Sequence, residues 1–435
     1  MRYFGNVFVI FVVRKGFMKR RTILKSIFFT LGYSVLHKLA GGRLWARPWD
    51  ADLHLHLLCA QSESAIDKFC KEYSWLKSCK AYLAKKKEKS YSQMQADSSF
   101  DWINNAISFG ESVIAECPPV PENLQIRKGA FQILDYPLYA NATGTKASKQ
   151  YKDAWHDALK SNYANRIDKI ISALAQPVKA GELAVWKLYN CGFVCKTSAG
   201  CVAIDLRPQY PLDFTQEQLD SLAKNLDVLV VSHPHFDHFD LSLIEAMAKL
   251  GKPVFAPNPS LVVRAAKGYI ERFNLNKTIT FYESKHPSFQ SLYNYGEAVG
   301  TKINGIEVIS YGGVQYKKEI PNSVYVVKMG GFTIQHCGDN QASPVNKVED
   351  LYDMIAQTHK VDVSFVNIWS GFVANVVKSK PQLVIPMHEN ELHHAPLGRV
   401  QYRWAWKMYD SLKSRGVDVP FIQLANGEKF IYKKG

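Results

Sequence analysis

The sequence lacks the signatures of several common enzyme classes. Its 435 residues contain no GxSxG motif, no Walker-type phosphate loop and no Rossmann glycine fingerprint. These motifs supply the nucleophile of serine hydrolases and the phosphate cradles of nucleotide-binding enzymes. Their absence removes serine hydrolases, P-loop NTPases and dinucleotide-dependent oxidoreductases from the leading function classes.

Cysteine pairs and long apolar runs are also scarce. The eight cysteines form no CxxC pair, although Cys70 and Cys79 could form a disulfide in an oxidising compartment. The apolar stretch 3–13 has eleven residues, whereas a helix needs ~20 to span a bilayer. Neither feature identifies the compartment.

The positive charge is concentrated near the beginning of the chain. The formal net charge is +15, and the first 50 residues hold ten Lys and Arg side chains against Asp50 alone. The run KAYLAKKKEK at 80–89 is typical of a solvated helix face. Because the excess is local, we expect no specific nucleic-acid partner.

Residues 1–46 have the composition of a targeting segment. Counted from Met18, the stretch KRRTILK resembles a twin-arginine export signal, followed by the apolar SIFFTLGYSVL and a possible cleavage site at LWA. We therefore expect an exported protein, periplasmic or membrane-associated through this segment. His37 and Lys38 interrupt the apolar part, so an uncleaved membrane-held segment or a cytoplasmic protein with a basic tail are the alternatives.

The periodicity of apolar residues changes near Lys179. Before it the pattern is helical, as in DWINNAISFGESVIAE at 101–116 and the stretch 149–175. After it the period is two, which is typical of strands. The sequence therefore predicts an all-helical region over 47–179 and an α/β domain over 180–435.

Within 180–435 apolar, β-rich runs alternate with helical stretches, which indicates a layered α/β fold. Asp240 is placed to cap the helix that follows it, and Gly416 is placed to end the helix near the C-terminus. A final hairpin is expected over FIQLANGEKFIY, turning on Asn426 and Gly427.

The stretch VVSHPHFDHFD at 230–240 contains three of the chain's 13 histidines. Imidazole and carboxylate groups at the end of a buried strand are costly to desolvate unless a cation receives them. His233 and His235 share a face if the strand continues, while Asp237 and His238 lie on the following loop. The donor set suits Zn²⁺, Mn²⁺ or Fe²⁺, and a cluster of surface histidines is the alternative.

HPHFDH resembles the HxHxDH signature of the metallo-β-lactamase superfamily, and the resemblance extends from Gly181 to the C-terminus. QHCGDN and LVIPMHEN resemble two later landmarks of that superfamily, and the whole is closest in style to its ascorbate-6-phosphate lactonase-like branch. The resemblance implies an αββα sandwich, preceded here by the helical region, with its site at one edge of the two sheets. It also implies six metal ligands: His233, His235, Asp237, His238, the bridging Asp339 and His388.

The resemblance implies one or two Zn²⁺ ions, with Mn²⁺ or Fe²⁺ possible. Asp237 would be the catalytic residue, since it would both ligate the metal and orient the attacking water. We expect a metal-dependent hydrolase of a lactone, ester, amide or phosphodiester, acting on a small-molecule or lipid substrate. The alternatives are a phospholipid or nucleotide phosphodiesterase, and a non-hydrolytic binding protein with a partly lost metal site.

One histidine of the superfamily pattern is missing. It is expected between the first motif and Asp339, but the stretch EVISYGGVQYKKEIPNSVYVV contains none. Gln315 or Tyr316 could stand in its place, and His286 is more distant. The ion at His233 and His235 is therefore expected to bind more loosely than the ion at His238 and His388.

Several further side chains lie near these motifs. His336 is an odd number of positions from Asp339, so a regular strand would put it on the opposite face. Cys337 shares the parity of Asp339 and could approach a metal as thiolate, although packing in the strand is favoured. Four other residues are candidates for substrate contact, with solvent exposure or ordinary packing as the alternative: His393, His394, Trp369 and Tyr311.

Overall fold

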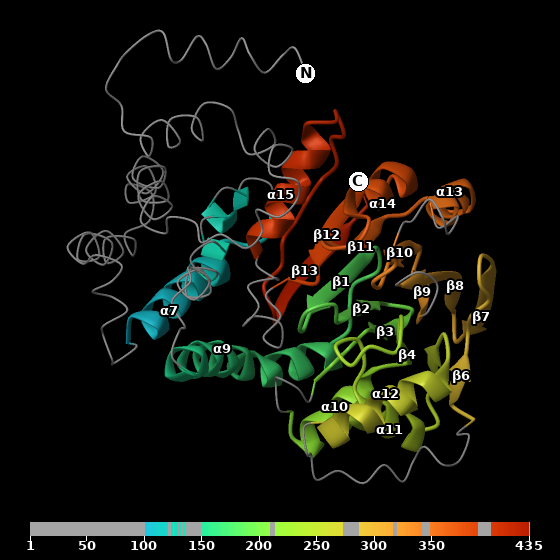
Figure 1. The fold of residues 1–435 in the computed structure, drawn as a ribbon, viewed down its shortest axis with the longest axis horizontal. Helices are drawn as coiled ribbons and strands as arrows, with labels where there is room; N and C mark the ends of the chain where they lie inside the picture. Colours follow the sequence, from blue (N-terminus) through green and yellow to red (C-terminus); the bar gives the residue numbers. More distant parts are fainter. Residues whose placement is uncertain are drawn as a thin grey trace, which may run out of the picture. The chain divides into compact units, whose positions relative to one another are not determined.

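The computed structural model describes residues 101–120, 123–124, 126–128, 130–131, 134, 149–208, 214–272, 287–315, 320–341, 349–389 and 402–434 (Figure 1). Several predictions concern residues outside these ranges and stay predictions: the targeting segment 1–46, the Cys70–Cys79 bridge, His286, Tyr316, His393 and His394. None of the helices within the described ranges is both long enough and apolar enough to cross a membrane.

Two of the helices in the described part of the chain lie before the strands. They are α7 (Asp101–Glu116) and α9 (Lys149–Ala175), and both occupy stretches for which the sequence predicts a helix. The C-terminal carbonyl groups of α9 are not left to solvent, because the ammonium group of Lys196 donates to the Leu174 and Gln176 carbonyls. A helix end satisfied by a side chain of the neighbouring sheet has a fixed position on that sheet.

The first sheet has seven strands in the order β13-β1-β2-β3-β4-β5-β6. Its strands are β1 (Glu182–Lys187), β2 (Phe193–Thr197), β3 (Gly200–Ile204), β4 (Val228–Val230), β5 (Val254–Ala256), β6 (Phe289–Ser291) and β13 (Glu428–Lys433). Pairing is antiparallel from β13 to β3 and parallel from β3 to β6. The sheet is therefore mixed.

The second sheet has six strands in the order β12-β11-β10-β9-β8-β7. Its strands are β7 (Ala298–Ile303), β8 (Ile306–Gln315), β9 (Ile320–Met329), β10 (Phe332–His336), β11 (Val363–Asn367) and β12 (Leu383–Met387). The pairs among β10, β11 and β12 are parallel, and the remaining pairs are antiparallel. An α/β fold with two mixed sheets confirms the predicted fold class at this level.

The alternating side chains of β1 show where the core lies. Leu183 and Val185 belong to the cluster that contains the second sheet, whereas Ala184 and Trp186 belong to the cluster that contains helices. Successive side chains of a strand point to opposite faces, so the first sheet is buried on both.

The helices around the sheets are α10 (Gln216–Asn225), α11 (Leu241–Lys249), α12 (Pro259–Arg272), α13 (Glu349–Thr358), α14 (Phe372–Ser379) and α15 (Tyr402–Lys413) (Figure 1).

The expected C-terminal hairpin is wrong. Gly427 does have the positive φ of 81° that a turn requires, but the residues before it form no strand with β13. Ile422 instead donates its amide to the Val384 carbonyl, and Val384 donates to Pro420. β13 pairs with β1, from Glu182 opposite Lys433 to Lys187 opposite Glu428. β13 thus pairs with β1, which is distant in sequence, and not with the segment directly before the turn.

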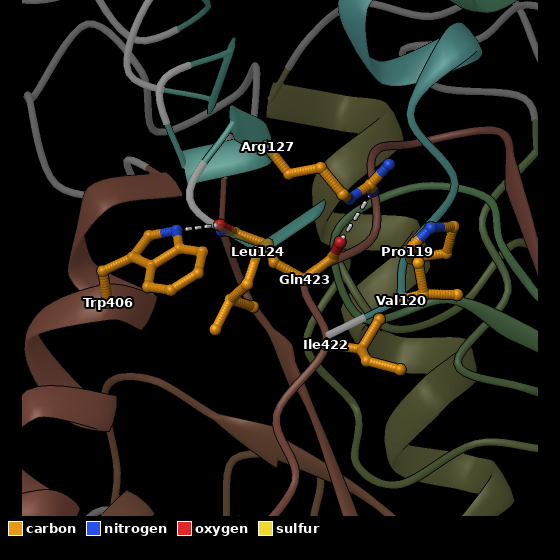
Figure 2. A pocket seen from close by; sticks show the side chains of 7 residues that line it. All are labelled: Pro119, Val120, Leu124, Arg127, Trp406, Ile422 and Gln423. Carbon is orange, nitrogen blue, oxygen red and sulfur yellow. Dashed lines mark hydrogen bonds between the residues drawn. The ribbon is translucent and has the colours of Figure 1, made fainter. Parts of the chain in front are cut away.

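Arg127 connects the segment before the strands to the C-terminal part of the chain. Its guanidinium is buried and donates to the Cys117 carbonyl at 2.6 Å, to the Gln423 carbonyl at 2.9 Å and to Glu428 at 2.6 Å. Figure 2 shows Arg127 beside Gln423, whose side chain accepts a hydrogen bond from the Trp406 indole. These contacts fix this part of the helical segment against α15 and β13.

Candidate metal centre

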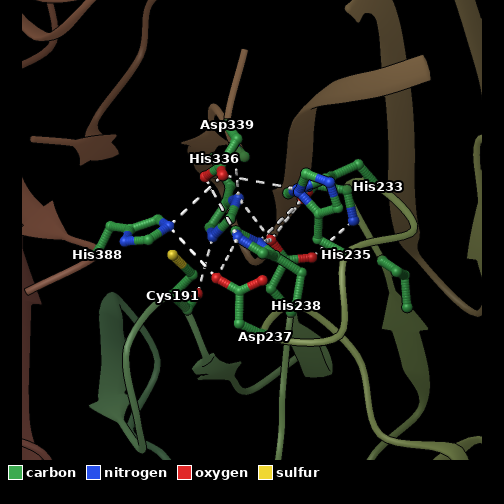
Figure 3. Close-up of polar contacts among 12 residues, drawn as sticks. Cys191, His233, His235, Asp237, His238, His336, Asp339 and His388 are labelled. Atoms are coloured by element: carbon green, nitrogen blue, oxygen red, sulfur yellow. Dashed lines mark hydrogen bonds and ion pairs between the residues drawn. The ribbon is translucent and has the colours of Figure 1, made fainter. Parts of the chain in front are cut away.

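The six predicted ligands lie together in Figure 3, where dashed lines join their side chains. His233, His235, Asp237 and His238 follow β4, Asp339 follows β10, and His388 follows β12. β3 is parallel to β4, and β10 is parallel to β11 and β12. Since the carboxyl ends of parallel strands meet at one edge, residues far apart in sequence converge there.

The loop that carries the HPHFDH motif is not an extension of β4, which ends at Val230. The sequence places His233 and His235 on one face only if the strand continues, and β4 ends before it reaches them. The loop turns sharply, with the His238 amide donating to the His235 carbonyl at 3.0 Å. It ends at Asp240, whose carboxylate caps α11 by accepting from the Ser242 and Leu243 amides, as the sequence predicts.

One group of donors surrounds His238 and His388. The Nε2 atom of His238 is 3.2 Å from Oδ1 of Asp339 and 3.4 Å from Oδ2 of Asp237. The Nε2 atom of His388 is 3.4 Å from Oδ2 of Asp237 and 3.5 Å from Oδ2 of Asp339. All four side chains are buried. The group matches the set that the resemblance implies for one ion.

These separations are those of ligands around a shared ion rather than of hydrogen-bonded pairs. Two donors that each lie ~2.1 Å from a tetrahedral ion are roughly 3.4 Å apart, whereas a charge-assisted hydrogen bond is about 2.7–2.9 Å. The Nε2 atom of His238 is fully buried and makes no hydrogen bond. A buried nitrogen without a hydrogen-bond partner, facing two carboxylates, fits a divalent cation.

A second group consists of His233, His235 and Asp339, whose ligand atoms all lie within 4.8 Å of one another. His233 Nε2 is 3.0 Å from His235 Nδ1 and 3.6 Å from Asp339 Oδ2. Asp339 thus belongs to both groups. This position is the one that the resemblance implies for a carboxylate bridging two metals.

Gln315, at the end of β8, reaches the second group. Its side-chain nitrogen donates to Asp339 Oδ2 at 2.9 Å, and its own oxygen, Oε1, is buried without a hydrogen-bond partner. Of the two residues considered for the missing histidine, Gln315 is the one that the described ranges include. An amide oxygen is a weaker donor to Zn²⁺ than imidazole.

Asp205 orients side chains of the site and is not among the residues that the sequence predicts for it. It follows β3, and its Oδ2 accepts from His238 Nδ1 at 2.7 Å and from the Ser232 hydroxyl at 2.6 Å. This bond places the proton of His238 on Nδ1 and leaves Nε2 free as a ligand. The signal for Asp205 in the sequence was its place directly after an apolar run that forms a strand.

Three amide side chains hold Asp339, two through its carboxylate and one through its backbone amide. Asn367 donates to Asp339 Oδ1 at 2.5 Å, Gln315 donates to Oδ2, and Asn322 accepts from the Asp339 amide at 2.9 Å. Each comes from a different strand of the second sheet. The carboxylate therefore has a defined orientation before any ion binds.

Charges inside the site alter the pKa values of its groups. Burial lowers the pKa of His233 well below its usual value, and the positive charge of His238 acts in the same direction. For His238 burial is outweighed by Asp339 and its neighbours, which raise the pKa well above the usual value. Burial opposes ionisation of Asp237, but His238 and His388 hold its pKa well below the usual range. The opposing shifts arise because imidazole and carboxylate groups lie close together in this buried cluster.

His336 and Cys337 belong to neither group of donors. His336 is fully buried, its Nε2 is 2.9 Å from the Cys191 carbonyl oxygen, and its Nδ1 accepts from the Gly338 amide. The Cys337 thiol donates to the Gly338 carbonyl and accepts from the Asn367 amide. Both residues therefore position the loops around the site.

Cys191, which the sequence did not indicate as a ligand, lies beside three members of the first group. Its sulfur, His238, Asp339 and His388 have ligand atoms all within 4.8 Å of one another. Burial raises the pKa of the Cys191 thiol to about 11, against the lowering effect of the two histidines. A turn between two strands, NCG, gave no metal-ligand spacing from which to find it.

Of the two aromatic candidates, only one lies near the site. Trp369 is 47% exposed and follows Asn367, whose side-chain oxygen accepts from the Trp369 amide at 2.6 Å. Its ring stacks on Trp404. Tyr311 is buried in the core, and its hydroxyl is 2.8 Å from His359. Ordinary packing explains Tyr311.

Comparison with known proteins gives matches over the same segment. Residues 193–388 match the model of the beta-lactamase superfamily domain. A "UPF0173 metal-dependent hydrolase" of Salinibacter ruber is 28% identical over 171 residues, which are 37% of this chain and 66% of that protein. The chain thus spans about two thirds of that relative's length.

Two solved structures are also similar. The metallo hydrolase Igni18 from Ignicoccus hospitalis has 17% identity and a TM-score of 0.40, with coverage of 58% of this chain and 100% of that one. A possible metal-dependent hydrolase from Veillonella parvula has 15% identity and a TM-score of 0.39, with coverage of 58% and 99%. The family match includes β2, the HPHFDH motif, Asp339 and His388. Over residues 193–388 the chain is therefore similar to the beta-lactamase superfamily domain.

Proposed function

We propose that this protein is a metal-dependent hydrolase that acts on a lactone, ester, amide or phosphodiester. The observation that carries the proposal is the spacing of the buried donors, since 3.2–3.5 Å separates His238 and His388 from the carboxylates of Asp237 and Asp339. The description of the Salinibacter ruber relative as a metal-dependent hydrolase supports it.

The residues of this chain have distinct tasks in the proposal. Asp237, His238, His388 and Asp339 would hold one ion, and His233 and His235 with Asp339 would hold a second. When bound, Zn²⁺ supplies Lewis-acid chemistry, because it lowers the pKa of a water molecule to about 7. Asp237 orients that water as hydrogen-bond acceptor, and the buried surroundings of the site strengthen each of these interactions.

The two proposed sites differ in strength. The set around His238 and His388 has four donors, whereas among the described residues His233, His235 and Asp339 have only the Gln315 amide to add. We therefore propose that dialysed protein retains closer to one Zn²⁺ ion than two, and that hydrolysis increases when Zn²⁺ or Mn²⁺ is added.

The test replaces single ligands. Asp237→Ala and His388→Ala should each reduce hydrolysis of an aryl ester, a lactone and an aryl phosphodiester by at least about 10³-fold, because each removes a donor and not a packing residue. The matched control is His359→Ala, which removes a buried histidine that contacts Tyr311. Thermal unfolding measures whether the variants remain folded.

The outcomes separate the candidate functions. Activity within a few-fold of the parent in both ligand variants would show that the chemistry occurs elsewhere. Tight metal binding without hydrolysis of any substrate class would support the non-hydrolytic binding protein. Preference for the phosphodiester over the lactone would support the phosphodiesterase.

A further inference from the structure

We infer that Cys191 is a thiolate ligand of the ion held by His238, His388 and Asp339. This inference rests on the proposed function, because it requires that the site bind a metal. It adds a sulfur donor to a set of nitrogen and oxygen donors, and it therefore concerns which metal the site prefers.

The Cys191 sulfur atom lies among the candidate ligand atoms. The Cys191 sulfur and the ligand atoms of His238, Asp339 and His388 lie within 4.8 Å of one another, and the Cys191 side chain is fully buried. Figure 3 shows the sulfur beside the His388 ring. The same cluster contains the buried Nε2 atom of His238, which has no hydrogen-bond partner.

The backbone of a tight turn fixes the position of the Cys191 sulfur. Cys191 lies in the tight turn between β1 and β2, where the Gly192 amide donates to the Tyr189 carbonyl at 2.7 Å. A Cβ atom on Gly192 would lie 3.0 Å from the carbonyl oxygens of Tyr189 and Asp205, so the turn leaves no room for a larger residue. The turn has little freedom to move the sulfur away.

Contacts from the second sheet hold the same turn. His336, at the end of β10, has its Nε2 atom 2.9 Å from the Cys191 carbonyl oxygen. The amide of His388 is 3.5 Å from the Asn190 carbonyl oxygen. These contacts attach the turn to the ends of β10 and β12, the strands that precede Asp339 and His388. The Cys191 sulfur is therefore held close to both residues.

The other described cysteines lie outside the two donor groups. Cys117, Cys195, Cys201 and Cys337 are also buried and free, yet neither donor group found in the described ranges contains any of them. A coordinating thiol loses its proton to solvent when the sulfur–metal bond forms. Thiolate favours Zn²⁺ and Co²⁺ over the oxygen-preferring Mn²⁺.

The test uses Co²⁺ as a spectroscopic probe. Protein loaded with one equivalent of Co²⁺ should show a sulfur-to-cobalt charge-transfer band in the near ultraviolet as well as the visible ligand-field bands. Cys191→Ala should lose the near-ultraviolet band and retain visible bands. Cys195→Ala is the matched control, because it removes an equally buried cysteine of β2 and should leave both sets of bands unchanged.

X-ray absorption of the Zn²⁺-loaded protein gives an independent measurement. The parent should show a sulfur neighbour at about 2.3 Å from zinc, and Cys191→Ala should show only nitrogen and oxygen neighbours. Bound zinc without a sulfur neighbour in the parent overturns the inference and leaves the proposed hydrolase intact. Failure of the parent to bind any divalent metal overturns both. Should Cys191→Ala fail to fold, the spectra of the parent protein decide alone.

Discussion

Asp205 determines which nitrogen of His238 is available to a metal. Its carboxylate accepts from His238 Nδ1 and from the Ser232 hydroxyl, and the Ser232 hydroxyl lies 3.0 Å from His233 Nδ1. One buried carboxylate thus influences a histidine in each donor group. Groups that orient metal ligands in this way affect affinity without touching the ion.

We expect Asp205→Asn to weaken metal binding by about 10- to 100-fold, because an amide cannot accept two hydrogen bonds with a full negative charge. Competition with a chromophoric chelator measures the change. The matched control is Asp227→Asn, which alters a carboxylate that accepts from the Cys201 amide away from the site. Equal affinities in the two variants would show that Asp205 does not orient His238.

Metal affinity should increase with pH. Against the cost of burial, Asp339 and its neighbours raise the pKa of His238, and Cys191 and Asp339 raise that of His388, in both cases well above the usual value. Below these raised pKa values protons occupy the ring nitrogens, so each displaced proton should contribute about tenfold in affinity per pH unit. Titration with Zn²⁺ from pH ~6 to pH ~8 tests this. A constant affinity would mean that both rings are neutral before metal binds.

The candidate ligands came from motifs that resemble those of a known superfamily. The HPHFDH motif and the two later landmarks gave six residues, and the structure brings all six together. Cys191, Asp205 and Asn367 reach the same site from other strands. Their contacts depend on strand order, which no local spacing encodes.

At the scale of elements, the loop after β10 depends on Gly338. It has φ of 54°, and a Cβ atom there would lie 2.5 Å from Oδ1 of Asn322 and 2.6 Å from Cβ of Ser232. Asn322 holds the Asp339 amide, so a clash at this point would displace the bridging carboxylate. The loop requires glycine for both its conformation and its space.

Gly338→Ala should therefore reduce both stability and metal occupancy. Gly331→Ala is the control, because Gly331 also has a positive φ, 83°, but a Cβ atom there would meet nothing within 4 Å. We expect the control to lose about 1–2 kcal/mol from the left-handed conformation alone. Differential scanning calorimetry and metal analysis measure the two effects. Full metal occupancy in Gly338→Ala would contradict the assigned role of this loop.

The sequence predicted elements well where their signals are local. Helices α7 and α9, the Asp240 cap and the end of α15 before Gly416 agree with it. The final hairpin was wrong because β13 pairs with β1, about 240 residues earlier. Turn residues indicate a change of direction, but they do not specify the partner strand.

At the scale of the molecule, a buried ion pair joins the two sheets beside the site. Lys187 ends β1 of the first sheet, and Glu389 follows His388 after β12 of the second. Their charged atoms are 2.8 Å apart, and both side chains are fully buried. Burial raises the pKa of Glu389, which Lys187 partly offsets.

Lys187→Met should cost about 3–5 kcal/mol of unfolding free energy, because it leaves the Glu389 charge buried without its partner. The double variant Lys187→Met with Glu389→Leu should recover most of this loss. Lys249→Met is the control, since Lys249 is 67% exposed and its pairing with Glu245 should contribute less than ~1 kcal/mol. Denaturant titration measures all three. A single variant as stable as the control would show that the pair is not structurally important.

The pairing of β13 with β1 also has a consequence for synthesis. Lys187 leaves the ribosome about 240 residues before Glu428, an interval on the order of 10 to 50 seconds at about 5–20 residues per second. Throughout that interval the β13-facing edge of β1 presents unpaired amide and carbonyl groups to other nascent chains. The seven-stranded sheet is therefore completed late in the synthesis of each chain. Until β13 pairs with β1, the open edge of β1 needs protection from other chains, and the folded structure no longer shows this need.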